Sequence, residues 1–152
     1  MSLRYRSTRG LAEPLEFGDV LLGGLAPDGG LYVPEVWPEL GAATRSGSLD
    51  YVGLATEVML PFVEGAIERD DFAAMVADAY ATFDAPEVCP LVELDDDLHL
   101  LELFHGPTLA FKDVALQLVG RLFDHELERR DDRVMIVGAT SGDTGSAAME
   151  AV

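Results

Sequence analysis

Residues 105–113 have the sequence His-Gly-Pro-Thr-Leu-Ala-Phe-Lys-Asp, and they contain the only lysine of the chain, Lys112. The remaining cationic side chains are arginines, which do not lose their proton in proteins. A lysine can lose its proton, attack a carbonyl carbon and form a Schiff base. Gly106 and Pro107 predict a turn, and a helical pattern begins at Lys112. The stretch therefore indicates either a reactive lysine or a surface lysine in a lysine-poor protein.

A second stretch has the order strand, glycine-rich loop, helix. Residues 134–137 are all apolar and predict a buried parallel strand. Thr140 to Gly145 follow as a glycine-rich loop, and Ser146 to Met149 predict the opening of a helix. This order predicts an anion site, because free backbone N–H groups and the positive helix end face one point. Many nucleotide and phosphate sites are built this way, so the loop alone does not specify its ligand.

Together, the two stretches resemble the fold-type II pyridoxal-phosphate enzymes, and within them the threonine synthase family. Three further segments look like the N-terminal third of that family: Ser-Thr-Arg-Gly at 7–10, Ala-Pro-Asp-Gly-Gly-Leu-Tyr-Val-Pro at 26–34, and Glu-Leu-Phe-His-Gly-Pro-Thr at 102–108. The resemblance runs from about residue 4 to residue 152. It implies an α/β fold of the tryptophan synthase β-like type, with only its N-terminal part present.

The resemblance also implies a chemistry, in which O-phospho-L-homoserine and water become L-threonine and phosphate. It implies that Lys112 forms a Schiff base with the cofactor, pyridoxal 5'-phosphate, and later moves protons. It further implies that the glycine-rich loop binds the substrate carboxylate. The loop residues concerned are Thr140, Ser141, Gly142, Thr144 and Gly145. Asp143 is implied to contact the cofactor, at a position where many relatives have asparagine.

Several assignments stay open at this point. His105 and Thr108 lie in the lysine turn and could touch cofactor or substrate, but a buried histidine bonded to the backbone is an equal alternative. Arg9 could meet the substrate phosphate, although a structural role is the simpler expectation. The activity could instead be that of another fold-type II lyase, such as a serine/threonine dehydratase or a phospho-lyase. A non-catalytic fragment that only binds a partner is a third alternative.

Composition narrows the class of partner and the compartment. The formal net charge of −18 argues against nucleic acid and anionic membranes as partners, and the resemblance implies a small-molecule substrate. No apolar run approaches the roughly 20 residues of a membrane span, and no signal-peptide pattern opens the chain. Cys89 is the only cysteine, which favours a reducing, cytoplasmic location. The aspartates at 95–97 predict a solvated hairpin tip, and we expect no metal site.

Hydrophobic periodicity and turn residues predict the remaining elements. The predicted strands are 5–8, 31–33, 91–94, 98–104 and a parallel strand at 133–137. The first predicted helix runs from the N-cap Ser48 to Val63, and the second is capped by Asp70 or Asp71 and has an apolar stripe from Phe72 to Phe83. A third helix is predicted at 112–129. Residues 16–22 fit either a strand or one helical turn. We place a domain boundary near residue 90, between a small N-terminal α/β region at 1–90 and the start of the cofactor-binding domain at 91–152.

We expect the chain to be a fragment of the family fold. The final helical pattern reaches Val152 without a terminating signal. Few parallel strands are predicted, and the family's second glycine-rich loop, which holds the cofactor phosphate, has no match here. Residues 1–152 alone should therefore be inactive and should self-associate through exposed apolar surface.

Overall fold

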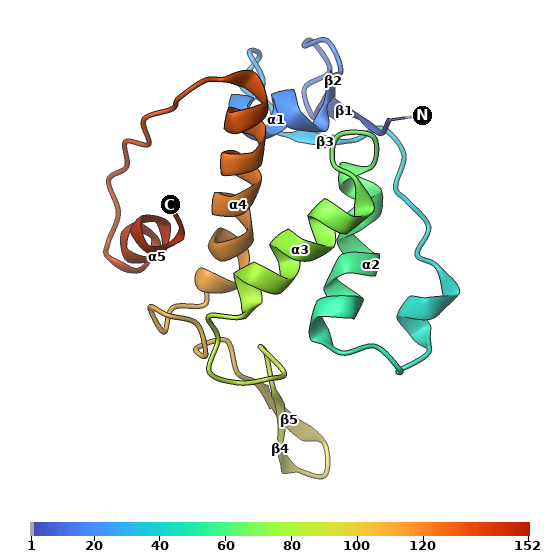
Figure 1. The fold of residues 1–152 in the computed structure, drawn as a ribbon, viewed down its shortest axis with the longest axis vertical. Coiled ribbons are helices and arrows are strands. Elements are labelled where there is room, and N and C mark those ends of the chain that lie inside the picture. Colours follow the sequence, from blue (N-terminus) through green and yellow to red (C-terminus); the bar gives the residue numbers. More distant parts are fainter. Residues whose placement is uncertain (1) are drawn as a thin grey trace. The chain divides into compact units, whose positions relative to one another are not determined.

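The computed structural model describes residues 2–152 (Figure 1). These residues form two compact units, one ending at Ala74 and the other beginning at Met75. The domain boundary predicted near residue 90 lies within the second unit and stays a prediction. Among the helices described, none is both long and apolar enough to cross a membrane.

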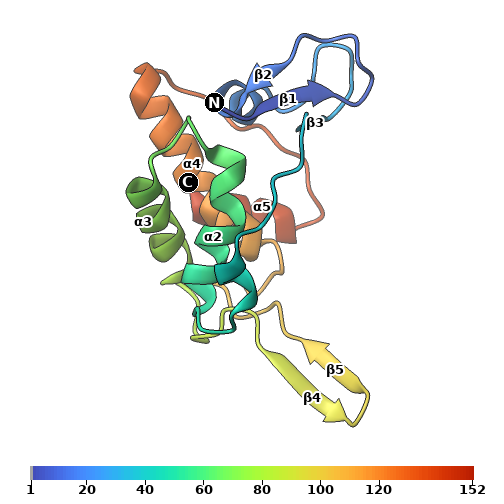
Figure 2. The ribbon, with the colours of Figure 1, turned by 90° about the vertical axis from the view of Figure 1, so that its right-hand side faces the viewer.

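The first unit contains a small antiparallel sheet with the strand order β2-β1-β3. Its strands are β1 (Arg4–Ser7), β2 (Leu15–Glu16) and β3 (Tyr32–Pro34), and they lie side by side in Figure 2. Tyr5 illustrates the register of the sheet, because it lies opposite Leu15 of β2 and Pro34 of β3. Helix α1 (Phe17–Gly23) follows β2 directly, so residues 16–22 are mainly helical. The strands predicted near 5–8 and 31–33 are confirmed.

Helix α2 (Tyr51–Val63) begins at a different cap from the one predicted. Asp50 is the N-cap, and its carboxylate accepts the backbone N–H of Gly53 at 2.8 Å. The prediction of Ser48 is wrong, because the Ser48 hydroxyl bonds Ser46 Oγ at 2.7 Å instead. A short 3-10 helix, η1 (Ala42–Arg45), lies in the segment before it. Pro61 is accommodated in the last turn of α2.

Helix α3 (Arg69–Tyr80) begins before both of its predicted caps. Asp70 and Asp71 therefore lie in the first turn, where carboxylates interact favourably with the positive end of the helix. The predicted apolar stripe is confirmed, since Phe72 is 1 % exposed and Val76 is fully buried. In the second unit the Tyr80 hydroxyl donates to Val114 O at 3.0 Å, which attaches the end of α3 to the following helix.

The second unit contains an antiparallel hairpin of β4 (Leu91–Asp95) and β5 (Leu98–Leu101), which Figure 2 shows in yellow-green and yellow. A register shift between Glu93 and Asp95 precedes its tip. The aspartate triplet at 95–97 forms that exposed tip, as predicted. In the chain from residue 2 onward, no group of three or more His, Cys, Asp or Glu side chains is arranged to hold a metal ion.

Two helices complete the second unit, α4 (Asp113–Arg130) and α5 (Asp143–Ala151). The predicted helix at 112–129 is confirmed to within one residue at each end. The two helices pack closely at Gly120, where an added Cβ would lie 1.9 Å from the backbone oxygen of Ala151. Glycine is required there because no larger residue leaves room for α5.

The strand predicted at 133–137 is absent from the structure. Its side chains are exposed, Met135 by 88 % and Val137 by 86 %. A strand needs a neighbour for its backbone hydrogen bonds, and none of the described residues provides one at this place. The prediction is therefore wrong for this structure, because the described residues contain no strand that could pair with this segment.

Candidate functional site

The candidate site is built on the turn that leads into α4. Lys112 is the N-cap residue of that helix, and its side chain is half-buried. The Nζ atom lies 3.9 Å from the centroid of the Phe111 ring, a cation–π distance. No carboxylate among residues 2–152 forms an ion pair with it. The amine is therefore held beside an aromatic face and remains available for reaction.

Asp113 fixes the shape of this turn from within. Its side chain is fully buried, and it accepts two hydrogen bonds of 2.8 Å from Thr108, one from the backbone N–H and one from the hydroxyl. Gly106 lies so close that an added Cβ would stand 2.4 Å from Asp113 Cβ. The role of Asp113 was not predicted from the sequence, although an aspartate in the first turn of a helix is a known capping signal.

Leu109 adopts a left-handed backbone conformation with φ of 62°. This conformation is costly for a branched side chain and persists only where surrounding bonds enforce it. Here the Leu109 N–H donates to Gly106 O at 3.1 Å, and the Asp113 N–H donates to Ala110 O at 3.0 Å. The backbone around Lys112 is therefore tightly defined.

His105 begins the turn and bonds two carboxylates. Its Nδ1 lies 2.7 Å from Asp84 Oδ1, and its Nε2 lies 2.7 Å from Glu102 Oε2. These bonds, the one to Glu102 first, raise the pKa of His105 above its usual value. The alternative that its ring bonds the backbone does not hold.

The glycine-rich loop leads into α5, which begins at Asp143 and thus before the predicted Ser146. Gly142 is the N-cap residue and has φ of 139°, a conformation that favours glycine. Thr140 Oγ1 accepts the backbone N–H groups of Gly142 at 3.2 Å and Gly145 at 3.1 Å. An added Cβ on Gly145 would lie 2.7 Å from that oxygen. Because residue 145 is glycine, the Thr140 side chain has room to form the two hydrogen bonds that hold the loop.

The loop presents free backbone donors. Asp143 and Thr144 are the first residues of α5, so their N–H groups have no acceptor within the helix. Residues 140–144, which include Ser141, are exposed. Lys112 directly precedes α4 and the loop leads into α5, and these two helices pack against each other. Within the described residues, however, no hydrogen bond joins Lys112 to the loop.

Arg9 lies in the first unit and bonds its own chain. Its Nη1 donates to the backbone oxygen of Asp28 at 2.8 Å. The Asp28 carboxylate in turn accepts from the Ser7 hydroxyl at 2.7 Å and from nearby backbone N–H groups, and these bonds lower its pKa. These contacts favour a structural role for Arg9.

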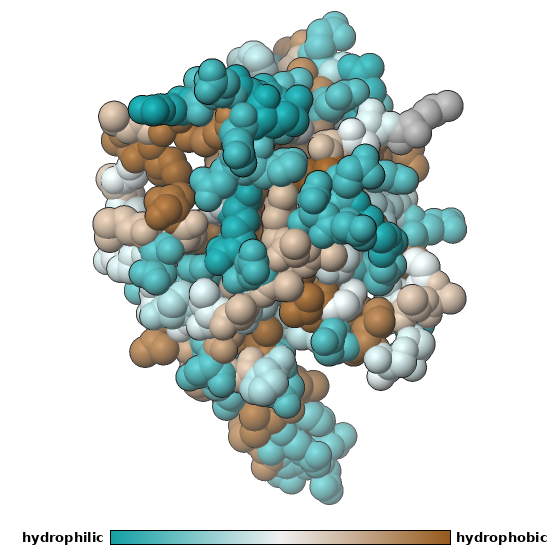
Figure 3. Space-filling model, viewed as in Figure 1, coloured by the Kyte–Doolittle hydropathy of each residue, from teal (hydrophilic) through white to brown (hydrophobic). Residues whose placement is uncertain are grey.

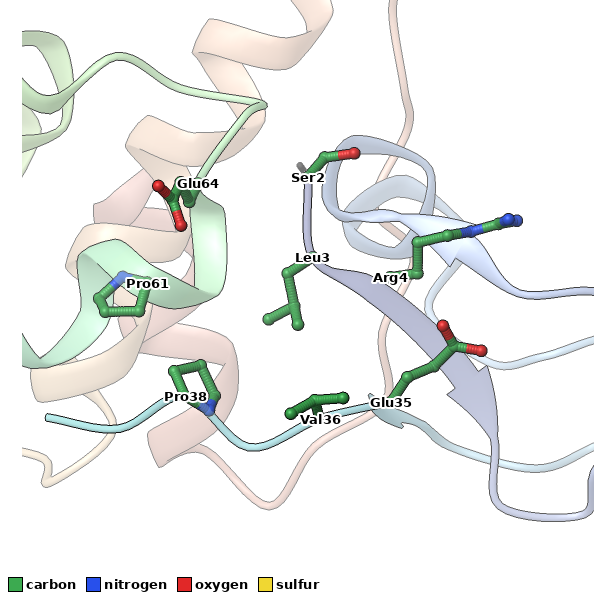
Figure 4. A pocket seen from close by; sticks show the side chains of 8 residues that line it. All are labelled: Ser2, Leu3, Arg4, Glu35, Val36, Pro38, Pro61 and Glu64. Carbon is green, nitrogen blue, oxygen red and sulfur yellow. The ribbon is translucent and has the colours of Figure 1, made fainter.

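The first unit also has a surface pocket of about 410 Å³ (Figure 4). Its lining residues are Ser2, Leu3, Arg4, Glu35, Val36, Pro38, Pro61 and Glu64. Leu3, Val36, Pro38 and Pro61 form its apolar part, as Figure 4 shows. None of the predicted site residues lines this pocket, so it does not bear on the chemistry of Lys112.

Comparison with known proteins identifies the family of this chain. The family model for the threonine synthase N terminus matches residues 4–80, about half of the chain. The chain belongs to the threonine synthase family. The predicted resemblance is thereby confirmed.

Related threonine synthases match almost the whole chain. It is 55% identical to the threonine synthase of Pseudomonas aeruginosa over 150 residues, which are 97% of this chain and 32% of that protein. It is 47% identical to the enzyme of Corynebacterium glutamicum over 95% of this chain and 32% of that protein. The chain thus spans about a third of the length of these threonine synthases.

Solved structures of threonine synthases have the same fold. The pyridoxal-phosphate-bound enzyme from Brucella melitensis superposes with a TM-score of 0.94 and 54% identity, over 99% of this chain and 33% of that one. The yeast enzyme gives a TM-score of 0.88 and 41% identity, over 99% and 33%. The predicted fold class, the N-terminal part of a fold-type II α/β enzyme, is therefore confirmed.

Proposed function

We propose that the protein to which this chain belongs converts O-phospho-L-homoserine and water to L-threonine and phosphate, with pyridoxal 5'-phosphate as cofactor. The observation that carries the proposal is the 55% identity with a threonine synthase over 97% of the chain. That match spans both the lysine turn and the glycine-rich loop. The geometry of the turn and of the loop supports the same reaction.

The lysine turn fits the aldehyde of the cofactor. Lys112 Nζ has no ion-pair partner in residues 2–152 and rests against Phe111, so the amine is not committed to a carboxylate. Such an amine can bond a carbonyl carbon, and Lys112 is the residue that would hold the cofactor covalently. When bound, pyridoxal phosphate supplies an electron sink for charge that develops on the substrate.

Lys112 also fits a role in proton transfer. Loss of phosphate from the substrate γ-carbon and addition of water at the β-carbon require protons to move at the α- and β-carbons. A single flexible amine can accept and return these protons at Nζ, provided that its backbone is fixed. Asp113 and Thr108 supply that fixed backbone through their two hydrogen bonds.

The glycine-rich loop fits the substrate carboxylate. The free N–H groups of Asp143 and Thr144 point from the positive end of α5, where an anion is stabilised. The hydroxyl of Ser141 is exposed and can donate to the same group. Thr140 Oγ1 already accepts two N–H groups, so its own hydroxyl hydrogen is left to donate to the carboxylate.

The remaining loop residues complete the assignment. Gly142 leaves room for the ligand to approach the backbone, and Gly145 leaves room for the Thr140 side chain that holds the loop. Asp143 is the proposed cofactor contact, and its carboxylate there requires a hydrogen-bond donor or a proton on its partner. We place the reaction in the cytoplasm, because the chain has a single cysteine, Cys89, which cannot form an internal disulfide.

We further propose that residues 1–152 on their own are inactive and self-associate. The β4–β5 hairpin pairs with no other strand among the described residues, and its leucines are exposed, Leu91 by 65 % and Leu98 by 58 %. Figure 3 shows apolar surface in brown on this hairpin. Unpaired strand edges with apolar side chains readily pair with another chain.

Product analysis with the intact protein tests the proposed reaction. Incubation with O-phospho-L-homoserine and pyridoxal phosphate should release threonine and inorganic phosphate in equal amounts. Release of phosphate with 2-oxobutyrate, and without threonine, would show an eliminating lyase instead.

A further inference from the structure

The ring of His105 is bonded at both of its nitrogens, by Asp84 and by Glu102, each at 2.7 Å. A neutral imidazole has one N–H, so its second nitrogen would direct a lone pair at a carboxylate oxygen. An imidazolium donates to both carboxylates, and such charge-assisted bonds are strong. The bond to Glu102 first, and the bond to Asp84 second, raise the pKa of His105 above 6.5. The charged ring is therefore the form that fits this geometry.

The two carboxylates bring separate segments to the start of the lysine turn. Asp84 lies beyond α3, and its backbone N–H also donates to His105 O at 3.0 Å. Glu102 directly follows β5, and its N–H donates to Pro90 O at 2.9 Å. We call His105, Asp84 and Glu102 the histidine clamp. The clamp joins the start of the turn to the segment after α3 and to the base of the hairpin.

The turn between His105 and Lys112 has little freedom to absorb a displacement. Gly106 is pressed against Asp113, and Leu109 is held in a left-handed conformation. Thr108 is bonded to Asp113 by both its N–H and its hydroxyl. A shift of His105 is therefore passed along the turn to Lys112.

We propose that His105, held as an imidazolium by Asp84 and Glu102, is a positioning residue that fixes Lys112 Nζ where it meets the cofactor aldehyde. The proposal rests on the proposed function, in which Lys112 holds pyridoxal phosphate. With both ring nitrogens engaged, His105 has no donor left for cofactor or substrate. Among the described residues, Asp84 and Glu102 are the titratable groups that contact the ring. As the pH rises through the raised pKa of His105, one N–H is lost and the clamp weakens.

The rate at which Lys112 is labelled tests the proposal without an activity assay. The intact protein is mixed with pyridoxal phosphate, reduced with borohydride at intervals, and the peptide containing Lys112 is weighed. His105→Gln should slow labelling by about tenfold or more, because small misplacements of a reacting group have effects of this size. His99→Gln is the matched control, since His99 is exposed on β5, and should label at the wild-type rate.

The pH dependence separates positioning by the charged ring from general structural damage. The ratio of wild-type to His105→Gln labelling rates should fall toward one as the pH rises through the pKa of His105, because the wild type then loses its clamp too. A ratio that stays constant with pH would overturn the proposal.

If His105→Gln fails to fold, variants of Asp84 and Glu102 test the same proposal. Glu102→Gln should slow labelling more than Asp84→Asn, because the Glu102 side chain is 22% exposed and the Asp84 side chain is 74% exposed. Nitrogen-15 spectra of the wild type should show that the ring of His105 is mostly doubly protonated at pH 6.5, the ordinary pKa of histidine.

Two results would distinguish a failure of the positioning role from a failure of the proposed function. Wild-type labelling at Lys112 that neither His105→Gln nor Glu102→Gln slows, or a His105 ring that is mostly singly protonated at pH 6.5, would overturn the positioning role alone. A wild type that is not labelled at Lys112 would overturn the proposed function, and the positioning role with it.

Discussion

The Asp113 carboxylate and the Thr108 hydroxyl lie 2.8 Å apart, and this pair closes the turn that carries Lys112. The same carboxylate accepts the Thr108 backbone N–H, also at 2.8 Å, and is shielded completely from solvent. A lysine side chain has many rotamers, so its reactive atom is placed reliably only if the backbone beneath it is fixed. In this protein the residue next to the lysine provides that fixed backbone.

Replacing Asp113 with asparagine should weaken the turn. The amide nitrogen replaces one carboxylate oxygen, so the Thr108 hydroxyl must turn to accept from it, and both contacts lose the strength that the carboxylate charge gave them. We expect a loss of about 1–3 kcal/mol in the free energy of unfolding, measured by urea denaturation of the intact protein. Asp124→Asn, at an exposed position of the same helix, should change it little. Equal stability of the two variants would contradict the role given to Asp113.

Gly120→Val should separate α4 from α5. The added Cβ would meet the Ala151 oxygen at 1.9 Å, a distance that neither backbone can tolerate without moving. We expect destabilisation of about 1–3 kcal/mol or more, as for other overpacked contacts. Gly23→Ala, where an added Cβ meets nothing within 4 Å, is the control. A Gly120→Val protein as stable as this control would show that the two helices do not meet here.

Gly145→Val should impair substrate binding more than cofactor binding. Its side chain would collide with Thr140 Oγ1, which organises the loop through two N–H groups. The KM for O-phospho-L-homoserine should rise by about tenfold or more, while the visible absorbance of the bound cofactor changes less. Loss of the cofactor band with unchanged substrate affinity would assign the loop to the cofactor instead.

Tyr5 should make the stability of the protein sensitive to alkaline pH. Burial raises the pKa of Tyr5 from 10.0 to about 12, and its hydroxyl donates to the backbone oxygen of Phe62. The unfolded chain therefore releases this proton at lower pH than the folded one. The stability that Tyr5 contributes is complete below pH 10 and is lost as the pH rises toward 12.

Thermal melts across that range test the Tyr5 prediction. Tyr5→Phe should flatten the fall in melting temperature, whereas Tyr32→Phe should leave it in place. A Tyr5→Phe protein with the same alkaline dependence as the wild type would contradict the assignment.

The sequence predicted the elements whose signals are local. The apolar residues of α4 recur with the helical period over its whole length, and both of its ends were predicted to within one residue. The lysine turn and the glycine-rich loop were recognisable because their residue types are unusual and contiguous. The predicted starts of α2 and α3 differ from the structure by two or three residues, since several neighbouring side chains there can accept the same N–H groups.

Features that depend on distant residues could not be predicted. Asp84 meets His105 across 21 positions, and no local pattern marks that pair. Val134 to Val137 have the composition of a buried strand, but composition cannot show whether a partner strand is present. The buried role of Asp113 depends on Gly106 and Thr108, which fold back onto it, and the residue types alone do not show that contact.

The most direct test of this account is the location of the cofactor in the intact protein. The protein is loaded with pyridoxal phosphate, reduced with borohydride and digested, and the labelled peptide is identified by mass. We predict the label on the peptide that contains Lys112, and Lys112→Ala should lose both the label and turnover. A label on the N-terminal amine or on another lysine, or normal turnover by Lys112→Ala, would contradict the account.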